Sequence, residues 1–240
     1  MTFDLPGFDL DAFVRASLAE DLGPTGRDVT SESVIPADMR FAGVMDSRDP
    51  IVVAGLPIAA AFFRHLDPEI EIETLAHEGH GVEAGTDLMR IRGKARAMLT
   101  AERSALNTVQ HLSGIATMTR QYVDAMAGHA TLLDTRKTIP GLRLAQKYAV
   151  KTGGGVNHRI GLYDAVLIKE NHIAAAGGVA AVLKRVQQTA PQARFVEIEV
   201  EHLAQLDEAL ACGATMVLLD NMDIPTLQEG LHPVTGAVLF

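Results

Sequence analysis

The second half of the chain alternates short apolar runs with amphipathic stretches, and this alternation restricts the possible folds more than any other feature. The apolar runs have the length of buried strands, and the stretches between them repeat apolar residues at helical spacing. The predicted strands are residues 131–134, 165–169, 194–200 and 215–220, and the predicted helices are residues 142–151, 179–189 and 202–212. A repeat of this kind predicts an α/β fold with a parallel sheet or barrel.

The first hundred residues follow a different pattern. Helices are predicted at residues 10–20 and 56–66, and β-like runs occur at residues 41–45, 51–54, 70–75 and 88–91. Thr100 suits the N-cap of a long helix from residue 101 to about residue 127. Arg103 would then lie in the first turn, where a cation is unfavourable unless it reaches outward to an anion. The change of pattern predicts two domains, residues 1–101 and 102–240.

Positive charge is concentrated in residues 134–172, DTRKTIPGLRLAQKYAVKTGGGVNHRIGLYDAVLIKENH. Seven basic and three acidic residues give this segment a net charge of +4, whereas the whole chain carries −9. The charges cluster where apolar runs end, at Asp134 to Lys137 and at Lys169 to His172. Ligands bind at the carboxyl ends of strands in parallel α/β folds, so this segment predicts a site for a polyanion.

Composition excludes several other classes of protein. No apolar run approaches the roughly 18 residues that a membrane helix needs, and the acidic N-terminus does not resemble a signal peptide, so we expect a cytoplasmic protein. A single cysteine, Cys212, excludes an internal disulfide and lies in an apolar pattern that predicts a small buried residue. The acidic balance and the lack of interleaved aromatic residues argue against nucleic-acid binding.

Six strings carry a resemblance to a known family: TAERSALN, LSGIAT, LDTRKTIPGLR, KYAVKTGGGVNHRIGLYDAVLIKENH, EIEVE and VLLDNM. Together they closely resemble the quinolinate phosphoribosyltransferase family, the decarboxylating enzymes of NAD biosynthesis. The resemblance extends from about residue 18 to residue 222. It implies an N-terminal α/β sandwich followed by an incomplete parallel α/β barrel. It also implies transfer from 5-phosphoribosyl 1-pyrophosphate to quinolinate, giving nicotinate mononucleotide, pyrophosphate and CO2.

The same resemblance implies how each substrate is bound. Arg136 and Arg159 match the family's clamp for the quinolinate carboxylates, with His158 beside them, and planar guanidinium groups suit carboxylates. Arg103 matches the arginine that crosses a dimer interface into the neighbouring subunit's site. We therefore expect a homodimer or a higher even oligomer.

Catalytic roles are implied for two lysines and two carboxylates. Lys137 and Lys169 match the lysines that face pyrophosphate and ribose. Glu199 and Asp220 end predicted strands, and Mg²⁺ held on the substrate supplies a partner for such carboxylates, directly or through the substrate. Glu197 shares a strand face with Glu199, but the resemblance selects Glu199. The glycines at 153–155 would allow backbone to approach the ligand closely.

The resemblance fails at the C-terminal end. The family continues through Glu-Ala-Ser-Gly-Gly and Gly-Ala-Leu-Thr-His-like segments that bind the ribose 5-phosphate, but after Met222 this sequence reads DIPTLQEGLHPVTGAVLF. Residues 236–240 look like the start of a strand. We therefore expect a truncated barrel with weak or absent turnover and a largely intact dicarboxylate clamp.

Three alternatives stay open at this point. A paralogue associated with molybdenum transport shares the DTRKT motif, although the intact KYAVKTGGGVNHR to KENH run argues against it. A catalytically silent quinolinate-binding homologue would suit the C-terminal departure. A Schiff-base lysine of an aldolase-type barrel would suit Lys169, although its cationic surroundings favour an anion site.

Overall fold

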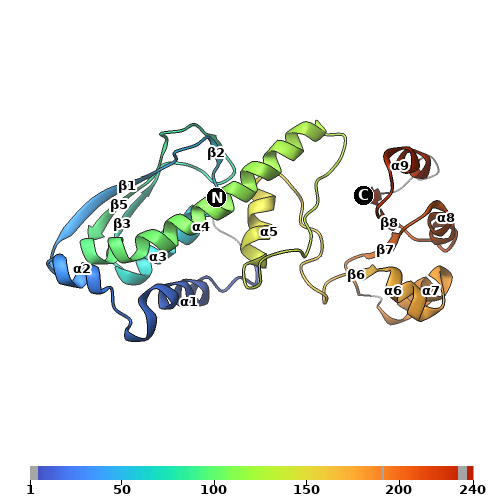
Figure 1. The fold of residues 1–240 in the computed structure, drawn as a ribbon, viewed down its shortest axis with the longest axis horizontal. Helices are drawn as coiled ribbons and strands as arrows, with labels where there is room; N and C mark the ends of the chain where they lie inside the picture. The colour runs from blue at the N-terminus through green and yellow to red at the C-terminus, as the bar shows by residue number, and fades with distance from the viewer. Residues whose placement is uncertain (1–4, 191, 232–236, 240) are drawn as a thin grey trace. The chain divides into compact units, whose positions relative to one another are not determined.

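The computed structural model describes residues 5–190, 192–231 and 237–239, which form two compact units, Met1–His158 and Arg159–Phe240 (Figure 1). Each unit has its own hydrophobic cluster. The predicted domain boundary at residue 101 lies within a long helix of the first unit and stays a prediction.

The first unit combines antiparallel strands with helices. Its elements are α1 (Leu10–Leu22), η1 (Gly23–Thr25), α2 (Val29–Val34), β1 (Arg40–Asp46), β2 (Ile51–Val52), α3 (Leu56–Leu66), β3 (Glu71–Thr74), β4 (Gly81–Val82), β5 (Asp87–Lys94), α4 (Ala95–Met126) and α5 (Arg143–Thr152). β5 lies between β1 and β3 in an antiparallel sheet, while β2 and β4 form a separate pair. α4 packs on α3, and its small residues Ala101, Ala105 and Ala116 are fully buried.

The long helix begins earlier than predicted. α4 starts at Ala95, directly after β5, so Thr100 is not its N-cap and Arg103 is not in its first turn. Contacts from distant residues replace the side-chain cap: Lys94 N donates to Asp67 Oδ2 at 2.9 Å and Ala95 N donates to the Met39 carbonyl at 2.9 Å. The argument that placed Arg103 against the helix dipole was therefore wrong.

The predicted strand at residues 131–134 was also wrong. The described chain there forms one isolated parallel bridge, between Leu133 and Val156. Leu132 and Leu133 are only partly buried, so the apolar run that predicted a strand does not enter a sheet.

The second unit confirms the predicted alternation of strands and helices. Its elements are β6 (Val166–Ile168), α6 (Glu170–Ala176), α7 (Val179–Thr189), β7 (Val196–Val200), α8 (Leu203–Ala211), β8 (Met216–Leu219), α9 (Ile224–Leu231) and β9 (Ala237–Leu239). The four strands are parallel in the order β6, β7, β8, β9. Part of the predicted C-terminal strand therefore forms β9, while Gly236 and Phe240 lie outside the described residues.

The helices of the second unit lie along one side of its sheet (Figure 1). Ile198 and Val200 of β7 are fully buried in the cluster that these helices form with the strands. Because side chains alternate along a strand, Glu197 and Glu199 point to the opposite face. Both carboxylates of β7 thus lie on the face away from the helices.

Candidate functional site

Asp134 is the centre of a buried polar network in the first unit. Its carboxylate accepts hydrogen bonds from Lys147 Nζ, from Asn157 Nδ2 at 2.7 Å and from His158 N at 2.9 Å. The Lys147 and Asp134 side chains are 2% and 6% exposed. This network joins the loop after residue 133 to α5 and to the segment that carries His158.

Arg136 and Lys137 follow this network in the chain. Arg136 Nε is buried and has no hydrogen-bond partner among the described residues, whereas Lys137 is exposed. A buried guanidinium donor without an acceptor is costly, so an anion at this position would remove that cost. Of the predicted residues in the first unit, His158 is therefore bonded to Asp134 through its backbone N, and Arg136 and Lys137 follow Asp134 in the same loop.

Two of the three glycines at 153–155 lie very close to other parts of the first unit, and their approach to a ligand stays a prediction. A Cβ atom at Gly153 would lie 2.5 Å from the Ala116 carbonyl oxygen, and one at Gly155 would lie 2.7 Å from Val150 Cγ1. Arg120 Nε donates to the Gly153 carbonyl at 2.8 Å. The close approach that these glycines permit is therefore to α4 and α5.

Lys169 and Glu199 form the central ion pair of the second unit. Lys169 follows β6, Glu199 is the fourth residue of β7, and Lys169 Nζ donates to Glu199 Oε2 at 2.7 Å. The hydrogen bond to Glu199 raises the pKa of Lys169, and the negative charges of Glu170 and Asp220 add to this effect. Lys169 is therefore protonated at neutral pH.

Asp220 follows β8 at the same end of the sheet. Its backbone N donates to the Val200 carbonyl at 3.0 Å, and Asn221 Nδ2 donates to Asp220 Oδ2 at 2.9 Å. Asn221 has a φ of 54°, a left-handed conformation that asparagine tolerates better than most residues. The turn after β8 therefore orients the carboxylate beside the charge of Lys169.

Glu197 is a further carboxylate on the face that carries Glu199. Its side chain is fully buried, and this burial raises the pKa of Glu197 to about 7. The positive charge of Arg159 opposes the increase in pKa, Glu199 adds to it, and Lys169 opposes it more weakly.

Sequence reasoning named Asp134 and Lys147 as charges but gave them no structural role. A signal was present, because seven cations and three acids in one segment favour the pairing of each acid with a cation. The choice of Lys147 as the partner depends on how α5 packs.

The carboxylates suit a cation that arrives with a substrate. Nowhere in the described ranges do three or more His, Cys, Asp or Glu side chains gather as metal ligands. Mg²⁺ commonly binds through one or two carboxylates together with substrate phosphates and water. Glu199 and Asp220 fit that pattern, although Glu199 already accepts a hydrogen bond from Lys169.

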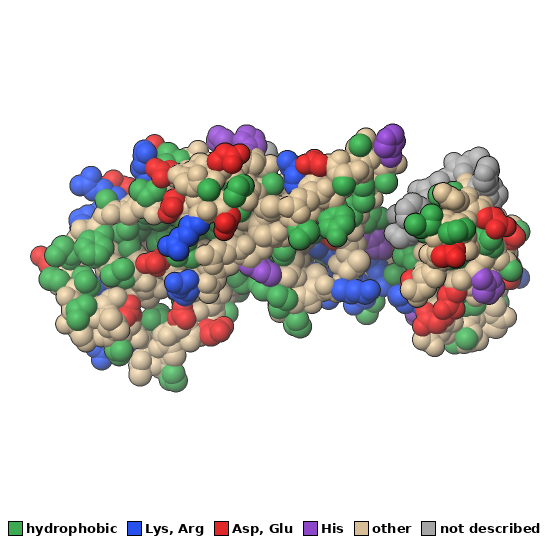
Figure 2. Space-filling view, turned by 45° about the horizontal axis from the view of Figure 1, so that its top comes forward, with side chains coloured by type: hydrophobic (Ala, Val, Ile, Leu, Met, Phe, Trp, Pro, Cys, Tyr) green, Lys and Arg blue, Asp and Glu red, His purple; other side chains and the backbone are tan. Residues whose placement is uncertain are grey.

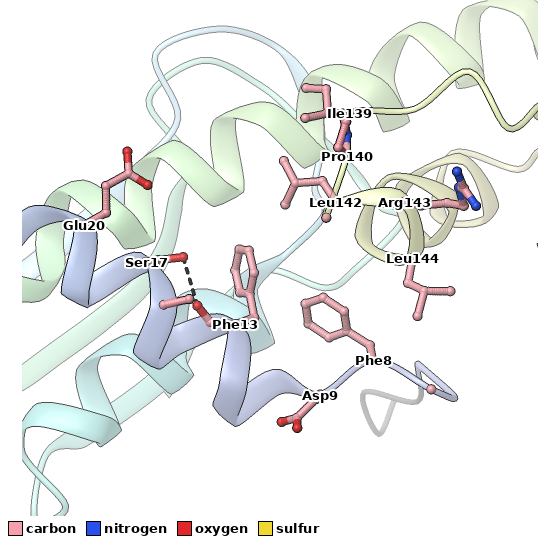
Figure 3. A pocket seen from close by; sticks show the side chains of 13 residues that line it. Phe8, Asp9, Phe13, Ser17, Glu20, Ile139, Pro140, Leu142, Arg143 and Leu144 are labelled. Atoms are coloured by element: carbon pink, nitrogen blue, oxygen red, sulfur yellow. Dashed lines mark hydrogen bonds between the residues drawn. The ribbon is translucent and has the colours of Figure 1, made fainter.

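A separate cavity of about 800 Å³ opens between α1 and residues 139–144 (Figure 3). The Phe8 and Phe13 rings, 5.3 Å apart, form one wall and Leu142 faces them. Arg143 Nε donates a hydrogen bond to Thr138 Oγ1 at 3.1 Å. None of the predicted site residues lines this cavity.

Known proteins match both parts of the chain. Residues 28–113 match the N-terminal domain of quinolinate phosphoribosyl transferase, and residues 115–237 match its C-terminal domain. A probable nicotinate-nucleotide pyrophosphorylase [carboxylating] of Synechocystis is 42% identical over 238 residues, covering 99% of this chain and 80% of the relative. The chloroplastic nicotinate-nucleotide pyrophosphorylase of Arabidopsis thaliana is 42% identical and covers 96% and 68%, respectively.

Solved structures give the same result. NadC from Streptococcus pyogenes has a TM-score of 0.90 at 38% identity, covering 95% of this chain and 81% of that structure. The nicotinate-nucleotide pyrophosphorylase of Francisella tularensis has a TM-score of 0.91 at 38% identity, covering 99% and 85%. No helix in the described part of the chain is long and apolar enough to cross a bilayer.

Proposed function

Because the chain belongs to the quinolinate phosphoribosyltransferase family, we propose that it transfers the phosphoribosyl group of 5-phosphoribosyl 1-pyrophosphate to quinolinate. The products are nicotinate mononucleotide, pyrophosphate and CO2. The observation that supports the proposal is the Lys169 to Glu199 pair, which lies at the carboxyl end of the parallel sheet, where ligands bind in α/β folds.

Quinolinate is held by guanidinium groups. Arg136 presents a buried Nε donor without a partner among the described residues, which suits a carboxylate of the substrate. Arg159 supplies a second guanidinium, and His158 is positioned through its backbone N by Asp134. Two carboxylates on one pyridine ring require at least two such donors for a defined orientation.

The transfer step forms the bond between the ring nitrogen and the anomeric carbon while the bond from that carbon to pyrophosphate breaks. Lys137 and Lys169 stabilise the negative charge of the departing pyrophosphate. Glu199 and Asp220 stabilise the developing positive charge of the ribosyl centre. Glu199 and Asp220 would hold Mg²⁺, directly or through the substrate, and the ion would supply positive charge to the leaving group.

Decarboxylation follows on the ribosylated ring. The bond from the ring carbon beside nitrogen to its carboxylate breaks, and the electron pair stays on that carbon, where the adjacent pyridinium nitrogen stabilises it. The carbon then takes a proton from solvent, and CO2 leaves. The chain's arginines need only hold the ring during this step.

A homodimer in which Arg103 reaches the partner's site is part of the proposal. Arg103 is exposed on α4, on the face opposite the buried alanines, and shares that face with Leu99 and Met118. Leu99 and Met118 are 39% and 55% exposed. Figure 2 shows hydrophobic side chains at the surface of the first unit among acidic and basic ones. Exposed apolar side chains beside a functional arginine favour a protein partner on this face.

The structure disfavours the aldolase alternative. A Schiff-base lysine needs a neutral amine, whereas the hydrogen bond to Glu199 raises the pKa of Lys169. The names of the relatives favour the enzyme over the molybdenum-transport paralogue and the silent homologue. The cytoplasmic location and the truncation expected from the sequence stay predictions.

The test is an assay of the purified chain with quinolinate, 5-phosphoribosyl 1-pyrophosphate and Mg²⁺, with product analysis by mass spectrometry. Nicotinate mononucleotide, pyrophosphate and CO2 are expected in equal amounts, with loss of activity in EDTA. Calorimetric titration with quinolinate would then separate the possible failures. Binding without turnover would support the silent homologue, and a folded chain that neither binds quinolinate nor turns over would overturn the proposal.

A further inference from the structure

The loop that carries Arg136 and Lys137 ends in a tight turn. Leu142 N donates to the Ile139 carbonyl at 3.0 Å, and Gly141, the third residue of the turn, has a φ of 82°. Proline at the second position and a glycine with positive φ at the third position are typical of a type II turn. The turn leads directly into α5.

This turn is only partly packed against the rest of the first unit. Ile139 is 48% exposed, and residues 139–144 border the cavity beside α1 (Figure 3). A side chain of α5 supplies a further bond, because Ile139 N donates to Gln146 Oε1 at 2.9 Å. The amide of Gln146 therefore ties the end of the loop to α5.

The Gln146 amide has a second partner on α4. Because a backbone N–H can only donate, the amide oxygen faces Ile139 and the amide NH2 group is left for another group. Gln146 Nε2 lies 2.9 Å from His111 Nε2, so this imidazole nitrogen is the acceptor of the bond. His111, Gln146 and Ile139 thus form one chain in which each donor meets an acceptor.

Hydrogen bonds within the loop connect this turn to Arg136. Thr138 N donates to the Arg136 carbonyl at 2.9 Å. Arg143 Nε, from the first turn of α5, donates to Thr138 Oγ1 at 3.1 Å. Because these residues are bonded to one another, a displacement of Ile139 would move Arg136 with it.

The loop is therefore anchored twice on α5. Lys147 binds Asp134 at the start of the loop, and the adjacent Gln146 binds Ile139 at its end. Arg136 lies between the two anchors, and its buried Nε has no partner among the described residues. The position of α5 thus determines where this guanidinium is presented.

We propose that Gln146, held by His111, is a positioning residue that presents the Arg136 guanidinium to a carboxylate of quinolinate. This inference rests on the proposed function. Gln146 needs no contact with the substrate, since it acts through the backbone of the loop. Its role depends on two acceptors, the one that Gln146 offers to Ile139 N and the one that His111 offers to Gln146.

Matched substitutions at Gln146 test this role by calorimetric titration with quinolinate. Gln146→Met keeps the length of the side chain but offers no good acceptor to Ile139 N, so the dissociation constant should rise by about fivefold, as for loss of one hydrogen bond. Gln146→Glu keeps that acceptor, and the other tautomer of His111 can donate to it, so its affinity should stay within about twofold of the unmutated protein. Gln187→Met, on the exposed surface of α7, is the control and should not change the affinity.

A second pair of variants tests the contribution of His111. His111→Met removes the acceptor for Gln146 Nε2 and should weaken quinolinate binding, by less than Gln146→Met does because its effect on the loop is indirect. The amide oxygen of His111→Gln can replace the imidazole nitrogen, so this variant should bind as the unmutated protein does. Equal affinities of the two His111 variants would overturn its part in the proposal.

A double-mutant cycle tests whether Gln146 acts through Arg136. Arg136→Lys keeps the charge but loses the Nε donor and the planar group. Gln146→Met should have little further effect on quinolinate affinity in that background. An equal effect in both backgrounds would overturn the proposal, because Gln146 would then act on binding independently of Arg136.

Amide hydrogen exchange measures the effect on the loop without any ligand. The Ile139 N–H should exchange faster in Gln146→Met than in the unmutated protein and in Gln146→Glu. Unchanged exchange in Gln146→Met, or unchanged affinity for quinolinate, would overturn the role of Gln146. Lack of quinolinate binding in the unmutated protein would instead count against the proposed function, and exchange at Ile139 would still decide whether Gln146 anchors the loop.

Discussion

The ammonium group of Lys147 donates to the carboxylate of Asp134 in the interior of the first unit, where both side chains are almost fully buried. The same carboxylate binds Asn157 Nδ2 and His158 N. A buried pair with further hydrogen bonds holds its neighbours in one arrangement. Asp134 therefore connects the loop that carries Arg136 to the segment that carries His158.

Removal of the ammonium group should destabilise the protein strongly. Lys147→Met would leave the Asp134 carboxylate buried without its cation, and we expect the free energy of unfolding to fall by about 3 kcal/mol or more. Denaturant unfolding at pH 7 measures this change. Lys151→Met, one turn later on α5 and exposed, is the control and should stay within about 0.5 kcal/mol of the unmutated protein. Equal stability of the two variants would contradict a stabilising role for the pair.

Lys169→Met should affect the reaction. The kcat is expected to fall by about 100-fold or more, because a charge that stabilises the leaving pyrophosphate is lost. Steady-state kinetics with both substrates measures the effect. Lys184→Met, on the exposed surface of α7, should leave kcat unchanged. A change in the KM for quinolinate alone would contradict the prediction, because it would mean that Lys169 contacts quinolinate and not the leaving pyrophosphate.

Mixed dimers test the proposed role of Arg103. Arg103→Ala and Lys169→Met should each be nearly inactive alone. If Arg103 acts in the partner's site, the mixed dimer has one site with both native residues, so equal mixing with subunit exchange should restore about one quarter of full activity. No recovery, despite exchange shown by native mass spectrometry, would place Arg103 in its own subunit's site.

Asp67 should make stability depend on pH. Its fully buried carboxylate accepts hydrogen bonds from Lys94 N at 2.9 Å and Glu69 N at 3.3 Å, and the bond from Lys94 lowers the pKa of Asp67. A carboxyl group with a lower pKa in the folded state stabilises that state above the unfolded pKa of about 4, and this stability is lost as the pH falls through the folded pKa.

Asp67→Asn should therefore reduce the free energy of unfolding by about 2 kcal/mol at pH 7, and this difference should shrink below about pH 4. Denaturant unfolding between pH 3 and pH 8 measures it. The exposed Asp38→Asn variant provides the comparison and should show no such dependence. A difference that stays constant down to pH 3 would mean that the charge of Asp67 is not involved.

The spacing of apolar residues along the sequence was sufficient to predict much of the fold. α3 (Leu56–Leu66) and α7 (Val179–Thr189) have the predicted limits, and the predicted strands and helices of the second unit are present, with α6 and α9 in addition. These elements are specified by the spacing of apolar residues over one short segment. The predicted places of Lys169, Glu199 and Asp220 at strand ends follow from the same local signal.

The sequence by itself thus determined the α/β class, the strand-helix repeat and the identity of the charged residues near the strand ends. Only the tertiary structure decided where α4 begins, because Asp67 and the Met39 carbonyl, both distant in the chain, occupy the place of a local cap. Only the tertiary structure shows that residues 131–134 form a single β-bridge and not a strand. It also shows that Lys147 is the cation that pairs with Asp134. These outcomes depend on which distant groups meet after packing, and the periodicity of a single segment carries no information about such meetings.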